Sequence, residues 1–75
     1  MRRIGTVVRT AQGLAIVRTT EEDPPSMGTP LVDENLDEIG QVVSVFGPVE
    51  RPYVAVDPTE GHAPATMLDR PLYAR

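Results

Sequence analysis

The chain lacks cysteine and lysine, and it has one histidine and three aromatic residues among 75 positions. The absence of cysteine excludes disulfide bonds, and His62 alone cannot supply the roughly four ligands of a structural zinc site. A chain this short buries only about 60% of its unfolded surface, so its own core is marginal. We therefore expect a single domain over residues 1–75 that depends on a partner for part of its stability.

Long apolar runs are also missing. None approaches the roughly 20 residues that span a bilayer. The basic start Met1-Arg2-Arg3 leads into Gly5 and Thr6 rather than into an apolar signal core. We expect a soluble, cytoplasmic protein.

The charge balance is acidic, with seven basic and eleven acidic residues and a net charge of −4. Nucleic-acid-binding proteins usually carry a basic stripe that displaces counterions from phosphates. Here the basic residues are scattered as Arg2, Arg3, Arg9, Arg18, Arg51, Arg70 and Arg75. This scatter argues against strong direct binding of RNA or DNA.

An acidic surface without lysine suits a salt-rich, halophilic cytoplasm. A melting temperature that does not rise from low to molar salt would contradict this interpretation.

Helix signals are nearly absent, because no apolar pattern keeps helical spacing over three turns and eight prolines and six glycines interrupt the chain. The short runs rich in valine, isoleucine and threonine are typical of β-strands. They predict strands over residues 4–10, 14–19, 29–32, 38–46, 53–56 and 71–74, with a helical turn near 65–68. Closure removes vulnerable strand edges, so the predicted fold class is all-β, a small closed β-barrel of about six strands.

Four glycines are expected at bends or points of close approach, namely Gly5, Gly28, Gly40 and Gly47.

The long strand 38–46 has two faces that are both partly apolar. Simple alternation places Ile39, Val43 and Val45 on one face and Val42 and Phe46 on the other. One face lines the core, and the other requires a cover such as a partner protein.

The corner after this strand is the most informative feature of the sequence. Phe46 and Val49 flank Gly47-Pro48, and Pro52-Tyr53 follow. A turn that only reverses the chain can be polar, so an apolar corner indicates a surface that another molecule covers. Interface cores are enriched in tyrosine, phenylalanine and arginine, and Arg51 lies close by. Phe46 fits the barrel interior equally well, whereas the hydroxyl of Tyr53 favours a half-exposed position at an interface.

Catalytic patterns are weak. Ser26 and Ser44 lack the glycine elbow of a hydrolase nucleophile, and His62 lies in a loop where no carboxylate can be identified to orient it as a base. Without lysine there is no phosphate-binding loop of the Gly-x-x-x-x-Gly-Lys kind. We expect no enzymatic activity, no cofactor and no metal site.

Two acidic clusters have alternative interpretations. The turn cluster contains Asp33, Glu34, Asp37 and Glu38. It fits a solvated turn better than an acid–base pair, which needs a cleft and shifted pKa values. Glu21-Glu22-Asp23 could contribute to a cation site, but a solvated loop is the commoner role of such a run.

Direct RNA binding is an alternative to a protein partner. Small barrels bind single strands by stacking bases on aromatic rings beside a basic groove. Phe46 and Tyr53 keep this alternative open, but no basic surround is apparent in the sequence. The apolar corner on an acidic chain therefore favours a protein partner.

The corner resembles the small β-barrel subunit of H/ACA ribonucleoproteins, the Gar/Naf family. The resemblance is carried by Ile39-Gly40-Gln41-Val42, Phe46-Gly47-Pro48-Val49 and Pro52-Tyr53-Val54. The flanking parts agree at Gly5-Thr6-Val7-Val8, at Gly28 with Pro30-Leu31-Val32-Asp33, and at Leu72-Tyr73. The similarity thus extends over most of the chain, roughly residues 4–73.

The resemblance implies a six-stranded, translation-factor-like barrel that is a non-catalytic subunit of an RNA-guided pseudouridine synthase particle. Such a subunit docks on the dyskerin-type pseudouridine synthase and assists substrate loading and product release in rRNA pseudouridylation, a step of rRNA processing and ribosome biogenesis. Its contact with the H/ACA guide RNA is indirect or weak. The chain has no glycine-arginine-rich tail of the eukaryotic kind, so an archaeal-type member is expected. The expected partner-binding residues are Ile39, Gly40, Val42, Phe46, Gly47, Pro48, Val49, Pro52 and Tyr53.

Overall fold

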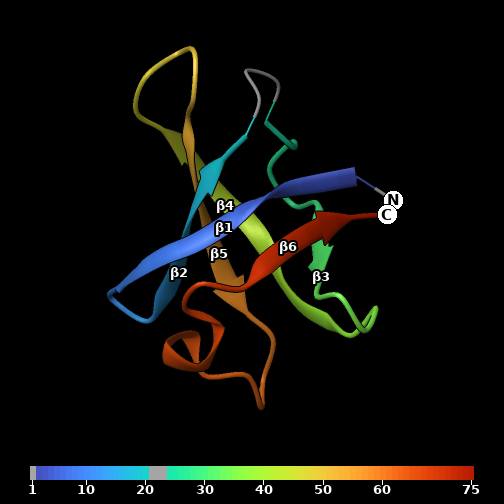
Figure 1. The fold of residues 1–75 in the computed structure, drawn as a ribbon. Helices are drawn as coiled ribbons and strands as arrows, with labels where there is room; N and C mark the ends of the chain where they lie inside the picture. The colour runs from blue at the N-terminus through green and yellow to red at the C-terminus, as the bar shows by residue number, and fades with distance from the viewer. Residues whose placement is uncertain (1, 21–23) are drawn as a thin grey trace.

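The fold is an antiparallel barrel, described from a computed structural model for residues 2–20 and 24–75. Six strands close in the order β1-β2-β5-β4-β3-β6 (Figure 1). The elements are β1 (Arg2–Ala11), β2 (Leu14–Thr19), β3 (Pro30–Val32), β4 (Glu38–Phe46), β5 (Tyr53–Pro58), the 3-10 helix η1 (Pro64–Met67) and β6 (Pro71–Ala74). The predicted fold class, an all-β closed barrel of about six strands, is confirmed.

The strand bounds follow the sequence prediction closely. β2, β4 and β6 have the predicted limits, while β1 and β5 extend further at their ends. β3 begins one residue later than predicted, because the amide of Thr29 closes a turn by donating to the Ser26 carbonyl at 3.1 Å. β1 and β2 form an antiparallel hairpin that turns through Gln12 and Gly13, which both have positive φ (52° and 80°).

Two glycines allow neighbouring strands to approach closely. A Cβ placed on Gly5 in β1 would lie 2.0 Å from the Arg18 carbonyl oxygen, and one on Gly40 in β4 would lie 2.5 Å from that of Asp57. No side chain fits at either distance, so glycine is required where these strands coil around the barrel. The expectation of close approach at these positions is confirmed.

The core fills the barrel with aliphatic side chains from every strand. Its buried members are Ile4, Val7, Ala15, Val17, Leu31, Ile39, Val42, Val54, Val56, Met67, Leu72 and Ala74. Met67 comes from η1, which lies across one end of the barrel (Figure 1). In the described residues, no helix is long and apolar enough to cross a membrane.

The predicted faces of β4 are wrong in one respect. Ile39 and Val42 were assigned to opposite faces, yet both lie in the core and are 2% and 1% exposed. The pairing register of β4 shifts opposite Leu31/Val32 and again between Val42 and Ser44. Each irregularity interrupts the two-residue alternation and redirects the following side chains. The strand therefore buries Ile39, Gly40 and Val42 and exposes its last two residues, with Val45 38% and Phe46 39% exposed.

Candidate docking site at the corner between β4 and β5

The corner comprises residues 46–53, where β4 ends and β5 begins. Phe46 pairs with Tyr53 across the two strands, and their rings stack with centroids 5.7 Å apart and planes 22° from parallel. Gly47 has φ of +92°, a left-handed conformation that disfavours any side chain. A Cβ at this position would also lie 2.9 Å from the Tyr53 ring. Glycine at position 47 thus allows the chain to leave β4 directly beside the aromatic pair.

The base of the corner is held by β2. The amide and the hydroxyl of Thr19 both donate to the Pro52 carbonyl, at 3.2 Å and 2.7 Å. Pro52 is buried and Thr19 is only 2% exposed. A buried hydroxyl needs such an acceptor, and here it fixes the point at which the chain enters β5.

The apex of the corner is open to solvent. Val49 is 82% exposed, the highest value among the large exposed apolar residues, and Pro48 is exposed as well. Phe46 is 39% exposed and Tyr53 is half-buried. These four side chains can therefore be reached by a partner without any change in the barrel.

The nine residues predicted to bind a partner separate into two groups. Phe46, Gly47, Pro48, Val49 and Tyr53 come together at the corner surface. The side chains of Ile39, Val42 and Pro52 are buried, and Gly40 lies against β5. Because the members of this second group are enclosed by the barrel, we leave them out of the proposed contact surface. Of these four, only Pro52 lies at the corner, since Gly40 pairs with Pro58 at the opposite end of β5.

Arg18 belongs beside the corner and was not singled out from the sequence. It lies opposite Tyr53 in the β2–β5 pairing and is exposed. The cross-strand row therefore runs Phe46, Tyr53, Arg18 over β4, β5 and β2. The pairing of β2 with β5 is the signal that places it there, and a single sequence does not contain that signal.

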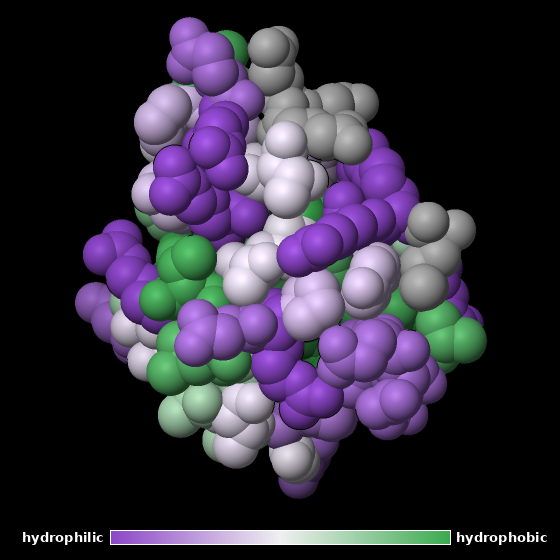
Figure 2. Space-filling model, viewed as in Figure 1, coloured by the Kyte–Doolittle hydropathy of each residue, from purple (hydrophilic) through white to green (hydrophobic). Residues whose placement is uncertain are grey.

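A second apolar area lies away from the corner. Figure 2 shows apolar residues grouped on the flank where β1 passes above η1. Val8 and Leu68 are 43% and 42% exposed, and backbone hydrogen bonds join Val7 to Asp69 and Arg70. This area exposes its side chains about half as much as Val49 and contains no stacked aromatic pair, so the corner is the stronger candidate.

His62 and the acidic turn, which were weighed as sites of acid–base chemistry, lie close to other side chains in the structure. His62 is half-buried beside a hollow of about 40 Å³ that Asp33 and Arg70 also line. Glu34 forms an ion pair with Arg70 at 2.7 Å and raises the pKa of Arg70 by accepting its hydrogen bond and by charge attraction. In residues 2–20 and 24–75, no three histidine or acidic side chains are grouped to hold a metal ion.

The acidic turn cluster is organised by one carboxylate. Asp33 Oδ1 accepts from the amides of Asn35 and Asp37, at 2.9 Å and 3.1 Å. This is the turn chemistry expected of aspartate. The acidic run Glu21-Glu22-Asp23 lies outside the described residues, so its predicted loop is neither confirmed nor contradicted.

Comparisons with known proteins relate this chain to a family. One curated relative, the H/ACA ribonucleoprotein complex subunit GAR1 of Chaetomium globosum, is 28% identical over 58 residues. The match covers 77% of this chain but only 28% of that relative's length. The family described as "Gar1/Naf1 RNA binding region" matches residues 1–74, nearly the whole sequence. The chain with the closed barrel and the apolar corner therefore belongs to the Gar1/Naf1 family.

Proposed function

We propose that this protein is a non-catalytic subunit of an H/ACA RNA-guided pseudouridine synthase particle and docks on the dyskerin-type synthase through the corner between β4 and β5. The observation that carries the proposal is the exposed apolar apex, with Val49 82% and Phe46 39% exposed next to Pro48 and Tyr53. Membership in the Gar1/Naf1 family and the H/ACA subunit named among its relatives support the choice of particle.

The proposed action is on a mobile loop of the synthase that engages the substrate RNA. A bound subunit shifts a two-state loop only by contacting its two positions with different free energy. The exposed corner and the rigid barrel behind it suit such a contact, because Thr19 and the ring stack fix where the apolar side chains point. Substrate loading and product release in rRNA pseudouridylation are the steps that this contact assists.

A non-catalytic role is part of the proposal. Glu34 is engaged by Arg70, and Asp33 is engaged by backbone amides of its own turn. These carboxylates have structural roles that account for their clustering. The chemistry of base modification is therefore assigned to the partner.

Two measurements test the proposal. The protein should co-purify with the synthase subunit when RNA is absent, and Phe46→Ala or Tyr53→Ala should weaken that complex by about 1–4 kcal/mol each. Adding the protein to a reconstituted particle should raise its multiple-turnover rate. An absent complex, or a particle whose turnover and substrate affinity are unchanged by the subunit, would contradict the proposal.

Direct RNA binding remains the second candidate function. The family's description names an RNA-binding region, and the Phe46–Tyr53 stack next to Arg18 is a surface on which a base can stack. A steep loss of RNA affinity with salt would support this function over the first.

A further inference from the structure

The arginines of this protein fall into two groups according to their partners. Arg3 donates to Thr6, Arg70 to Glu34 and Arg75 to the Leu36 carbonyl. Arg2 is also engaged. Among the described residues, Arg9, Arg18 and Arg51 form no ion pair and no side-chain hydrogen bond.

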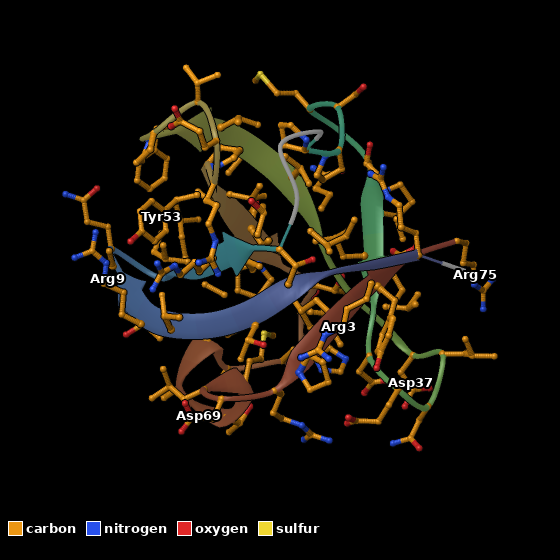
Figure 3. All side chains as sticks on the ribbon, turned by 45° about the horizontal axis from the view of Figure 1, so that its top comes forward. Arg3, Arg9, Asp37, Tyr53, Asp69 and Arg75 are labelled. Carbon is orange, nitrogen blue, oxygen red and sulfur yellow. The ribbon has the colours of Figure 1, made fainter. Side chains whose placement is uncertain are left out.

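The three arginines without a partner all lie around the corner. Arg51 is in the corner loop itself, and Arg18 is directly opposite Tyr53. Arg9 lies one row further along the same face, opposite Ile16. Figure 3 shows Arg9 and Tyr53 on the same side of the barrel, whereas Arg75 lies on the far side.

Two buried apolar side chains lie between Arg9 and the row formed by Arg18, Tyr53 and Phe46. Ile16 and Ala55 pair with each other on β2 and β5 and alternate with core residues, so their side chains point out of the barrel. They are nevertheless only 4% and 3% exposed. Surrounding side chains therefore cover them, so the accessible part of this face consists of the flanking side chains, among them the exposed Arg9, Arg18 and Phe46.

The carboxylates are concentrated elsewhere. Of those in the described residues, Glu50 alone lies in the corner. The others lie in the β3–β4 turn, at the start of β4 and along the chain from the end of β5 to the start of β6, namely Asp33, Glu34, Asp37, Glu38, Asp57, Glu60 and Asp69. Among the described residues, the corner and the face beside it thus hold three arginines without a partner and one carboxylate, Glu50.

We propose that the partner surface that covers the corner carries carboxylates around an apolar pocket, and that Arg9, Arg18 and Arg51 pair with those carboxylates. This inference rests on the proposed docking function and specifies the chemistry of the partner. Arginine suits the task because its planar fork matches a carboxylate with two parallel hydrogen bonds. RNA phosphates fit the face less well, because the apex is aliphatic at Pro48 and Val49 and the net charge of −4 repels a polyanion.

The test compares variants in their binding to the purified synthase subunit at about 0.1 M and about 1 M salt, where charges are screened beyond about 10 Å and about 3 Å. Each of Arg9→Gln, Arg18→Gln and Arg51→Gln should weaken binding about two- to fivefold at the lower salt. The loss should appear mainly in the association rate. The triple variant should lose most of the salt dependence of wild type, and Arg18→Lys should retain it because the charge remains.

Arg75→Gln is the matched control, since it removes the same charge on the opposite side of the barrel (Figure 3). It should bind with the wild-type affinity and salt dependence. Melting temperatures of the Arg9, Arg18 and Arg51 variants should match wild type, because these side chains are exposed and make no internal pair.

The outcomes separate this inference from the function on which it rests. A triple variant that binds like wild type at both salts, while Val49→Ala binds more weakly, overturns the inference and leaves the docking function standing. A triple variant that keeps its affinity for the synthase but loses affinity for single-stranded RNA also overturns it. A wild-type protein that does not bind the synthase at all overturns the docking function itself.

Discussion

The β3–β4 turn and the corner between β4 and β5 lie at opposite ends of β4 and differ in how their polar and apolar groups are satisfied. The β3–β4 turn is polar and is satisfied from within. Asp33 accepts from two amides of the turn, Glu34 binds Arg70, and the Leu36 carbonyl accepts from Arg75. Each of these polar groups has a partner inside the molecule, so the turn needs no other molecule to complete it.

The corner between β4 and β5 is held only at its base. Below the apex, Thr19 binds the Pro52 carbonyl and Phe46 stacks on Tyr53. At the apex, Val49 is 82% exposed and Arg51 has no partner among the described residues. The comparison indicates that exposed apolar surface on a fixed base distinguishes the proposed docking loop from the polar turn.

Of the substitutions that test this comparison, Gly47→Ala should reduce both stability and docking the most. The new Cβ would lie 2.9 Å from the Tyr53 ring, at a backbone φ of +92°. We expect a loss of about 1–3 kcal/mol in the free energy of unfolding and a clear loss of docking, measured by chemical denaturation and by binding to the synthase.

Gly13→Ala is the control for that change, because Gly13 has φ of +80° but no atom within 4 Å of the added Cβ. It should lose a similar amount of stability from backbone strain alone and keep its affinity for the synthase. Equal docking losses in the two variants would show that docking follows overall stability and not the ring contact at the corner.

Thr19→Val should have an intermediate effect. The substitution preserves the shape of the side chain but removes the 2.7 Å bond from its hydroxyl to the Pro52 carbonyl. We expect the free energy of unfolding to fall by about 1 kcal/mol, with weaker docking because the entry into β5 is less firmly placed. Unchanged stability would mean that the buried hydroxyl does not anchor the corner.

Asp33→Ala should act on the polar turn alone. It removes the acceptor of the Asn35 and Asp37 amides in an exposed loop. The expected loss is about 0.5–1 kcal/mol of stability with no change in docking, measured by the same two assays. A docking loss would mean that the polar turn also contacts the partner, which would contradict the proposal that only the corner docks.

Much of the fold could be predicted from the sequence, because the signals for it are local. Valine-rich runs, prolines and glycines indicated the strands, and the acidic cluster around Asp33 predicted the polar turn that the structure contains. The faces of β4 could not be predicted, because its two register irregularities arise from pairing with β3 and β5 and break the alternation that a lone strand shows.

The candidate site was predictable in part for the same reason. The exposed apolar apex follows from Gly47-Pro48-Val49, whose composition is unusual for a simple turn. The Pro52 carbonyl accepts a hydrogen bond from Thr19, which is 33 residues away in the chain. The position of Arg18 depends on the pairing of β2 with β5. Contacts between distant segments such as these appear only once the barrel is closed.

The most direct test of the account is the affinity of Val49→Asp for the synthase subunit, measured by calorimetry alongside Leu36→Asp. Leu36 is 49% exposed in the polar turn and serves as the matched apolar control. We predict that both variants fold, that Leu36→Asp binds like wild type, and that Val49→Asp binds about tenfold or more weakly because a carboxylate is buried against the partner. Wild-type affinity in Val49→Asp would contradict the claim that the corner is the docking surface.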